Sequence, residues 1–346
     1  DMKDAWIAAF KLPNFFRRLF GEGGLSVSFI PVYVGLLEKG ESKDSQALAN
    51  GIFTLLMSLI ALICLLLFLF MDPVINFWLG GSGFSDIPGK IAMTITMARI
   101  MVFFLFFICL FAFFMAILNA NKKFTLSGYA PMVLNLSIIA GLWMYRDSEH
   151  IVLASALSVV IGGALQAFLL LPAMIKVHGF PRINFSLDHP SVQIVVKKFM
   201  PTLLGVGVLQ ILGLINASFA SRLMPGAVTY IYAADRLLEL PLSLIAVSIG
   251  TTVLPTLSGY WSRQETGSFI ASLSRQLSLF YFLAIPCVFG FWFLGADIVD
   301  ILFNRGKFTF SEVLIVSDIL KIYCLTLMAA GSLKIVTQAL YATGDT

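Results

Sequence analysis

Charged and metal-ligating residues are scarce in this sequence. Asp, Glu, Lys and Arg make up 12% of the 346 residues, against about 25% in a typical soluble domain. Four cysteines lie in apolar runs without CxxC spacing, and three histidines, His150, His178 and His189, fall between apolar runs without paired carboxylates. We interpret the cysteines as small apolar side chains and the histidines as solvated surface residues. The scarcity argues against a metal centre and, because the net charge is only +4 without a basic tail, against a nucleic-acid partner.

Apolar residues dominate the sequence. They form 59% of the chain, and the mean hydropathy is +0.92. Runs of about 20 residues or more, the length that crosses a bilayer as a helix, occur at 5–37, 47–71, 91–119, 125–145, 151–175, 198–222, 227–257, 272–296 and 314–342. The sequence therefore predicts an all-α, multi-pass membrane protein with nine spans.

The loops between these runs alternate in positive charge. Loops 38–46, 120–124, 176–198 and 259–275 hold ten Lys and Arg residues, and the alternate set holds five. Lys and Arg in short loops favour the cytoplasmic side, so residue 1 is expected outside. The chain begins with "DMKDAW" and stops at "ATGDT", both within apparent structure, and we expect a fragment of a longer protein with at least one further span before Asp1.

A weak internal repeat divides the chain. A shift of 224 residues lays "SFIPVY" on "TVLPTL", a shift of 225 lays "DPVINFWLGG" on "DIVDILFNRG", and a shift of 222 lays "ILNANKKF" on "ALYATGDT". Six spans separate the counterparts, so the two halves run in the same direction, and parallel repeats of this kind commonly hold a substrate between them. We predict an N-terminal lobe at 1–175, a cytoplasmic linker at 176–198 and an incomplete C-terminal lobe at 199–346.

Some charges fall inside the predicted spans, where each costs about 2.5–3.5 kcal/mol on insertion scales and usually faces the bundle interior or a watery cavity. They are Asp4, Lys11, Arg17, Arg18, Glu22, Arg99, Asp235, Arg236, Glu239, Asp318, Lys321 and Lys334. The spacing of Arg236 and Glu239 permits an ion pair on one helix flank. The alternative interpretation is that these charges form structural salt bridges or reach the membrane surface.

Proline and glycine in the first span predict a bend. Pro13, like Pro241 in the seventh span, removes a backbone hydrogen bond, and Gly21, Gly23 and Gly24 loosen the helix after the arginine pair. The alternative is close helix packing through small residues.

These residues favour transport over catalysis, because no nucleophile, base or metal set is evident. Arginine binds phosphate oxyanions bidentately and keeps its charge, which indicates an anionic substrate. Acids within the spans, Asp4, Asp235 and Glu239, would instead suit cation export. The residues alone leave the sign of the substrate open.

Five stretches resemble the MviN/MurJ family of bacterial lipid II flippases, in the MOP exporter superfamily. They are "DAWIAAFKLPNFFRRLFGEGGLSVSFIPVY", "GYAPMVLNLSII", "YIYAADRLLELPLSLIAVSIGTTVLPTLS", "RGKFTFSE" and "ALYATGDT". The resemblance covers essentially the whole chain. It implies a fourteen-span MATE-like protein with two helical lobes around a central cavity, of which this chain carries spans two to ten.

The resemblance also implies a function in the bacterial cytoplasmic membrane. The substrate is lipid II, the undecaprenyl-diphosphate-linked disaccharide-pentapeptide precursor of peptidoglycan, moved to the outer leaflet by alternating access among membrane lipids, with cell-wall synthesis proteins as further partners. Its implied substrate-binding residues are Asp4, Arg17, Arg18, Arg236 and Glu239. No cofactor is implied, and a monovalent coupling ion stays open. The alternative is a related exporter of other polyprenyl-diphosphate-linked sugars, or of drugs by cation antiport.

Overall fold

The computed structural model describes residues 2–20, 25–184, 188–306 and 308–343, and all regular secondary structure in these ranges is helical. The chain divides into two compact units, unit 1 at Asp1–Val228 and unit 2 at Thr229–Thr346. Contacts thus group the helix at 190–221 with unit 1, whereas the lobe boundary predicted from the sequence, 198/199, falls inside this helix. The division by contacts does not test the sequence repeat, so the lobe boundary at 198/199 stays a prediction.

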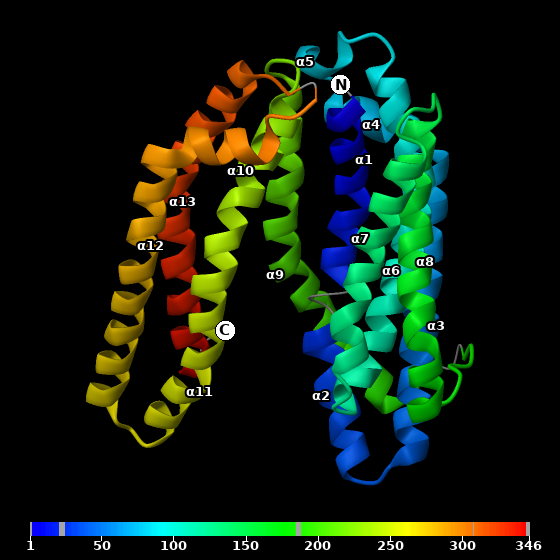
Figure 1. The fold of residues 1–346 in the computed structure, drawn as a ribbon. Coiled ribbons are helices and arrows are strands. Elements are labelled where there is room, and N and C mark those ends of the chain that lie inside the picture. Colours follow the sequence, from blue (N-terminus) through cyan, green and yellow to red (C-terminus); the bar gives the residue numbers. More distant parts are fainter. Residues whose placement is uncertain (1, 21–24, 185–187, 307, 344–346) are drawn as a thin grey trace. The chain divides into compact units, whose positions relative to one another are not determined.

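Unit 1 is a bundle of long helices (Figure 1). Its elements are α1 (Met2–Arg17), α2 (Leu25–Glu38), α3 (Ser42–Leu69), α4 (Met71–Leu79), α5 (Ser82–Ser85), α6 (Lys90–Ala120), α7 (Thr125–Met144), α8 (Ile151–His178) and α9 (Pro190–Ser221). The central element is α6, which is apolar on all sides and contacts α1, α2, α3 and α8. A helix of that kind is stable only when it is surrounded, and its Phe104, Leu105 and Phe113 are fully buried.

Small residues let neighbouring helices approach α6 closely. A Cβ added at Gly163 of α8 would lie 2.5 Å from a ring carbon of Phe104. On α1, Ala5, Ala8 and Ala9 are fully buried, and α1 packs along α6. Because α1 packs closely on α6, the positions of the charged residues of α1 relative to α6 are fixed.

Unit 2 contains α10 (Ala227–Pro241), the π-helical segment η2 (Leu242–Val247), α11 (Ser248–Ser262), α12 (Thr266–Phe303) and α13 (Phe310–Ala342). The long helices α12 and α13 pack together, and α11 packs on both (Figure 1). A Thr309–Glu312 capping box begins α13. One core cluster lies between α10, α12 and α13 around Ala234, Val299 and Leu320.

In the described part of the chain, six helices are long and apolar enough to cross a membrane, namely α3, α6, α7, α8, α12 and α13. They match six of the nine predicted spans. The predicted span at 198–222 lies within α9 except for its last residue, but those at 5–37 and 227–257 are not single regular helices. The first comprises α1 and α2, and the second comprises α10, η2 and α11.

Both irregular spans contain π-helical turns at equivalent places in the repeat. Residues 18–20 continue α1 as a wider, π-helical turn, and η2 follows directly after Pro241. A shift of 224, the offset already found in the sequence, places residue 18 on Leu242. The structure therefore adds an independent match to the internal repeat. Pro241 is the last residue of α10, directly before the π-helical segment, whereas Pro13 lies four residues before the end of α1.

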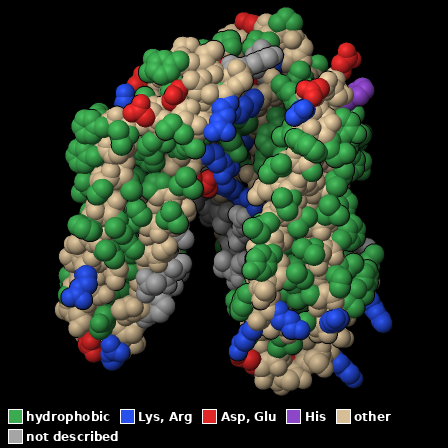
Figure 2. Space-filling model, viewed as in Figure 1, with side chains coloured by type: hydrophobic (Ala, Val, Ile, Leu, Met, Phe, Trp, Pro, Cys, Tyr) green, Lys and Arg blue, Asp and Glu red, His purple; other side chains and the backbone are tan. Residues whose placement is uncertain are grey.

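The surface of each unit is apolar along its flanks, as expected of helices that cross a membrane (Figure 2). Hydrophobic side chains cover the flanks of each unit, and Lys and Arg gather at the lower end of unit 1 in this view. The basic residues of the α2–α3 and α6–α7 turns, Lys39, Lys43, Lys122 and Lys123, are all exposed.

Candidate functional site

The carboxylate of Asp4 is the centre of a buried polar cluster in unit 1. It accepts a hydrogen bond from Lys90 Nζ at 2.7 Å and another from the backbone N–H of Gly226 at 2.9 Å. Asp4 is 2% exposed and Lys90 1% exposed. The Lys90 ammonium also lies 4.4 Å from the ring centroid of Phe84, a cation–π distance. Asp4 thus joins the start of α1 to the start of α6 and to the loop after α9.

Sequence reasoning did not find Lys90 as a partner. In the sequence, Lys90 immediately precedes the apolar run at 91–119 and lies 86 residues from Asp4, so no local pattern links the two. A buried charge needs a partner of opposite sign, so the available signal was the acid at position 4 itself. That signal predicts that a partner exists and does not say which residue it is.

The chain around this cluster is packed backbone against backbone. A Cβ at Gly81 would lie 2.8 Å from the backbone nitrogen of Arg222, and one at Gly83 would overlap the carbonyl group of Leu223. Trp78 Nε1 donates to the carbonyl oxygen of Leu214 at 2.8 Å. The α4–α5 segment is therefore fixed against the end of α9, next to the Asp4 ion pair.

The arginine pair lies far from Asp4 along the same helix. Arg17 ends α1, and its Nε donates to Asn14 Oδ1 at 2.7 Å. Thirteen residues of helix place Arg17 about 20 Å from Asp4, so the structure does not bring these two predicted site residues together. Arg17 and Arg18 are both partly buried, and Arg18 begins the π-helical turn. The predicted hinge residues Gly21, Gly23 and Gly24, with Glu22, lie outside the described residues.

Arg236 and Glu239 form the ion pair that their spacing predicts. Arg236 Nη1 donates to Glu239 Oε2 at 2.6 Å, with the side chains 43% and 49% exposed. The guanidinium carbon lies 4.8 Å from the ring centroid of Tyr232. On the other flank of α10, Ala234 and Leu237 pack into the core of unit 2. The exposed flank of α10 thus carries Arg236 and Glu239 on a rigid support.

The remaining charges within predicted spans include two more ion pairs. Arg99 of α6 binds Asp72 of α4, and Lys321 Nζ lies 2.9 Å from Asp318 Oδ1 one helical turn away. These residues therefore form salt bridges, which is the alternative interpretation given in the sequence analysis.

The prediction that all three histidines are solvated surface residues is wrong for His178. His178 is the last residue of α8, is buried, and its Nδ1 lies 2.9 Å from the hydroxyl of Tyr33. Its burial was not predicted because α8 extends to His178, three residues past the end of the predicted span at 151–175. Within the described residues, no three His, Cys, Asp or Glu side chains gather as metal ligands would.

The bundle of long apolar helices, with charged residues in helices that contain π-helical turns, defines a multi-pass α-helical membrane protein. The family described as "Lipid II flippase MurJ" matches residues 1–346. The chain belongs to this family, and it is a multi-pass protein of the bacterial inner membrane.

Curated relatives and solved structures agree with this assignment. The chain is 40% identical to a protein named "Probable lipid II flippase MurJ" from Bdellovibrio bacteriovorus, over 99% of this chain and 66% of the relative. It is 32% identical to "Lipid II flippase MurJ" of Burkholderia cenocepacia, over 99% of this chain and 67% of the relative. The chain thus spans about two thirds of the length of these relatives.

Among solved structures, "Lipid II flippase MurJ, inward closed conformation" superposes with a TM-score of 0.84 at 26% identity, over 100% of this chain and 70% of that one. An inward-facing MATE family transporter of the MOP superfamily has a TM-score of 0.76 at 12% identity, over 99% of this chain and 80% of that one. The second likeness shows the fold alone, and it confirms the predicted MATE-like architecture.

Proposed function

We propose that the protein of which this chain is a part moves lipid II from the inner to the outer leaflet of the bacterial cytoplasmic membrane. Its proposed diphosphate-binding residues are Arg17, Arg18 and Arg236, and the polyprenyl tail stays in lipid. Asp4 and Glu239 hold the arginine-bearing helices in place. Transport proceeds by alternating access, with bending near Pro13 and the Gly21–Gly24 segment.

One observation carries the proposal beyond family membership. Arg236 is 43% exposed on α10, held by Glu239 and Tyr232, with its own unit's core on the opposite flank. A guanidinium that faces lipid would be costly, so this flank is best explained as facing a hydrated space. An oriented arginine in such a space suits a diphosphate, because its planar fork binds two oxygens at once.

No catalytic step and no resident cofactor belong to the proposal. An anionic headgroup moving outward gains about 2.3 kcal/mol per charge per 100 mV of inside-negative potential. The potential alone therefore favours net movement toward the outer leaflet.

Lipid II binding to the full-length protein tests the proposal. Native mass spectrometry would compare lipid II with undecaprenyl monophosphate as a competitor, in wild type and in Arg236→Ala. We expect lipid II to be preferred, and the preference to fall in the variant. Equal binding of both lipids that does not change in Arg236→Ala would contradict the role of this arginine and the diphosphate selectivity.

A further inference from the structure

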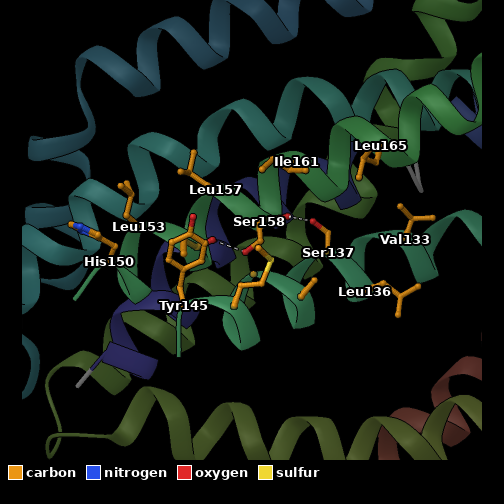
Figure 3. A pocket seen from close by; sticks show the side chains of 14 residues that line it. Val133, Leu136, Ser137, Tyr145, His150, Leu153, Leu157, Ser158, Ile161 and Leu165 are labelled. Atoms are coloured by element: carbon orange, nitrogen blue, oxygen red, sulfur yellow. Dashed lines mark hydrogen bonds between the residues drawn. The ribbon is translucent and has the colours of Figure 1, made fainter. Parts of the chain in front are cut away.

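A groove runs along unit 1 between α7 and α8 (Figure 3). Its volume is about 690 Å³. Its lining includes the small residues Ser137, Ala140 and Gly141 of α7 and Ser158 of α8, which we call the floor, and Figure 3 shows Ser137 and Ser158 next to each other. Large apolar side chains form the walls, including Leu136, Leu153, Leu157, Ile161 and Leu165.

The small residues create the groove by letting the two helices touch. A Cβ at Gly141 would lie 2.6 Å from Ser158 Oγ, and one at Gly162 would lie 2.9 Å from Ser137 Cβ. The hydroxyl of Ser137 donates to the carbonyl oxygen of Ser158 at 2.8 Å, and that of Ser158 donates to the carbonyl oxygen of Ala154 at 2.6 Å. Because both hydroxyls donate to backbone, the floor offers mainly apolar contacts.

The groove has the length of a lipid chain. Along α8 its lining extends from His150 to Leu165, which is about 22 Å of helix. One leaflet of the hydrocarbon core is about 15 Å thick. A single extended acyl chain therefore fits lengthwise, between walls that are 42% exposed at Leu157 and 53% exposed at Ile161.

One end of the groove is polar and carries both signs of charge. A second hollow, of about 550 Å³, shares Met144 with the groove and is lined by Arg146, Asp147 and Ser148. Arg146 Nε lies 2.9 Å from Asp147 Oδ2, with the side chains 67% and 84% exposed. Exposed Trp143 and Tyr145 lie beside them, as aromatic residues do at membrane–water interfaces.

We propose that the α7–α8 groove binds a glycerophospholipid of the outer leaflet whose headgroup carries a phosphate and a primary ammonium group. One acyl chain lies in the groove, the phosphate contacts Arg146, and the ammonium contacts Asp147. The mixed charge favours this zwitterionic headgroup over a purely anionic one. The outer leaflet follows from the charge of the loops, since the α7–α8 turn belongs to the set with fewer Lys and Arg. This site is separate from the proposed transport residues and does not depend on the flipping of lipid II.

The test uses the protein in proteoliposomes with phosphatidylethanolamine that carries a photoreactive diazirine on one acyl chain. After irradiation, mass spectrometry compares labelling of residues 133–165 with that of the exposed flank of α3. We expect several-fold more label in the groove, displaced by an excess of unlabelled phosphatidylethanolamine. Ala140→Phe should reduce the groove label to the level of α3, whereas Ala61→Phe, the same change at an exposed alanine of α3, should not.

The headgroup is tested with phosphatidylglycerol that carries the same labelled chain. We expect it to label the groove several-fold less than phosphatidylethanolamine, and Arg146→Gln to lower the phosphatidylethanolamine signal several-fold. Equal labelling of the groove and α3, or equal labelling by the two headgroups, would overturn the proposal. Displacement by undecaprenyl phosphate and not by phosphatidylethanolamine would also overturn it, in favour of a polyprenyl site. The displacement results come from wild type, so they do not depend on how Ala140→Phe folds.

Discussion

Asp4 and Lys90 form an ion pair sealed from solvent, with 2.7 Å between Nζ and Oδ2, across 86 residues of sequence. The same carboxylate oxygen binds the backbone N–H of Gly226. Three segments of unit 1, the starts of α1 and α6 and the loop after α9, therefore share one buried charge pair.

Removing Lys90 should destabilise unit 1 strongly. Lys90→Gln leaves the Asp4 carboxylate buried without its countercharge, and breaking a buried pair on one side costs about 3–5 kcal/mol. We expect a clear fall in the midpoint of thermal unfolding in detergent. Size-exclusion chromatography of samples heated to increasing temperatures measures this midpoint. Lys39→Gln, at an exposed turn position, is the control. The double variant Asp4→Asn/Lys90→Gln should recover part of the loss, and no recovery would mean that the pair is not what stabilises this end.

Arg236→Ala and Arg17→Ala should abolish flipping and leave the amount of folded protein unchanged. Loss of one charge-assisted contact to the substrate costs about 1.5–3 kcal/mol, a roughly ten- to hundredfold loss of affinity. Leaflet translocation of lipid II in proteoliposomes of the full-length protein measures the effect. Lys321→Ala is a matched control, because Lys321 also belongs to an ion pair with a residue three positions away in unit 2. Near-normal flipping by either arginine variant would remove that residue from the site.

Gly83→Ala should loosen the contact between α5 and the loop after α9. The added methyl group would overlap the backbone carbonyl of Leu223, which cannot rotate away as a side chain does, and overpacking of this kind costs about 1–3 kcal/mol. Gly128→Ala on α7 is the comparison, since nothing lies within 4 Å of its added Cβ and alanine favours helix over glycine by about 1 kcal/mol. The melting temperature should fall in the first variant and hold or rise in the second. No fall in Gly83→Ala would show that the Leu223 backbone yields to the methyl group, and the same fall in both variants would mean that this overlap is not the cause.

Cysteines placed at the two ends of α7 should react on opposite sides of the membrane. The 20 residues of α7 span about 30 Å, the thickness of the hydrocarbon core. A membrane-impermeant maleimide should label Lys123→Cys from the cytoplasmic side and Arg146→Cys from the outside. Wild type gives the background, because Cys64, Cys109 and Cys324 are buried and Cys287, which is partly exposed within α12, can add to the signal. Labelling of both positions from one side would contradict the orientation that we assign from the loops.

Local patterns predicted much of this structure, and contacts between distant segments escaped them. Length and apolarity located α3, α6, α7, α8, α12 and α13 because a helix that crosses lipid needs a long uncharged run. A three-residue spacing predicted the pair of Arg236 with Glu239, since such neighbours meet on any helix. The pair of Asp4 with Lys90 could not be predicted in this way, because packing of α1 on α6 decides it and no sequence period encodes it.

The π-helical turns after Arg17 and after Pro241 also bear on the history of the chain. A wide turn takes up an extra residue and rotates everything that follows on the helix. Both halves have this irregularity at the same place in a repeat whose sequences have otherwise diverged. Inheritance accounts for it with one event, whereas independent origin needs two. Duplication of a half-length gene whose helix already had the wide turn is thus the simplest history consistent with the two π-helical turns.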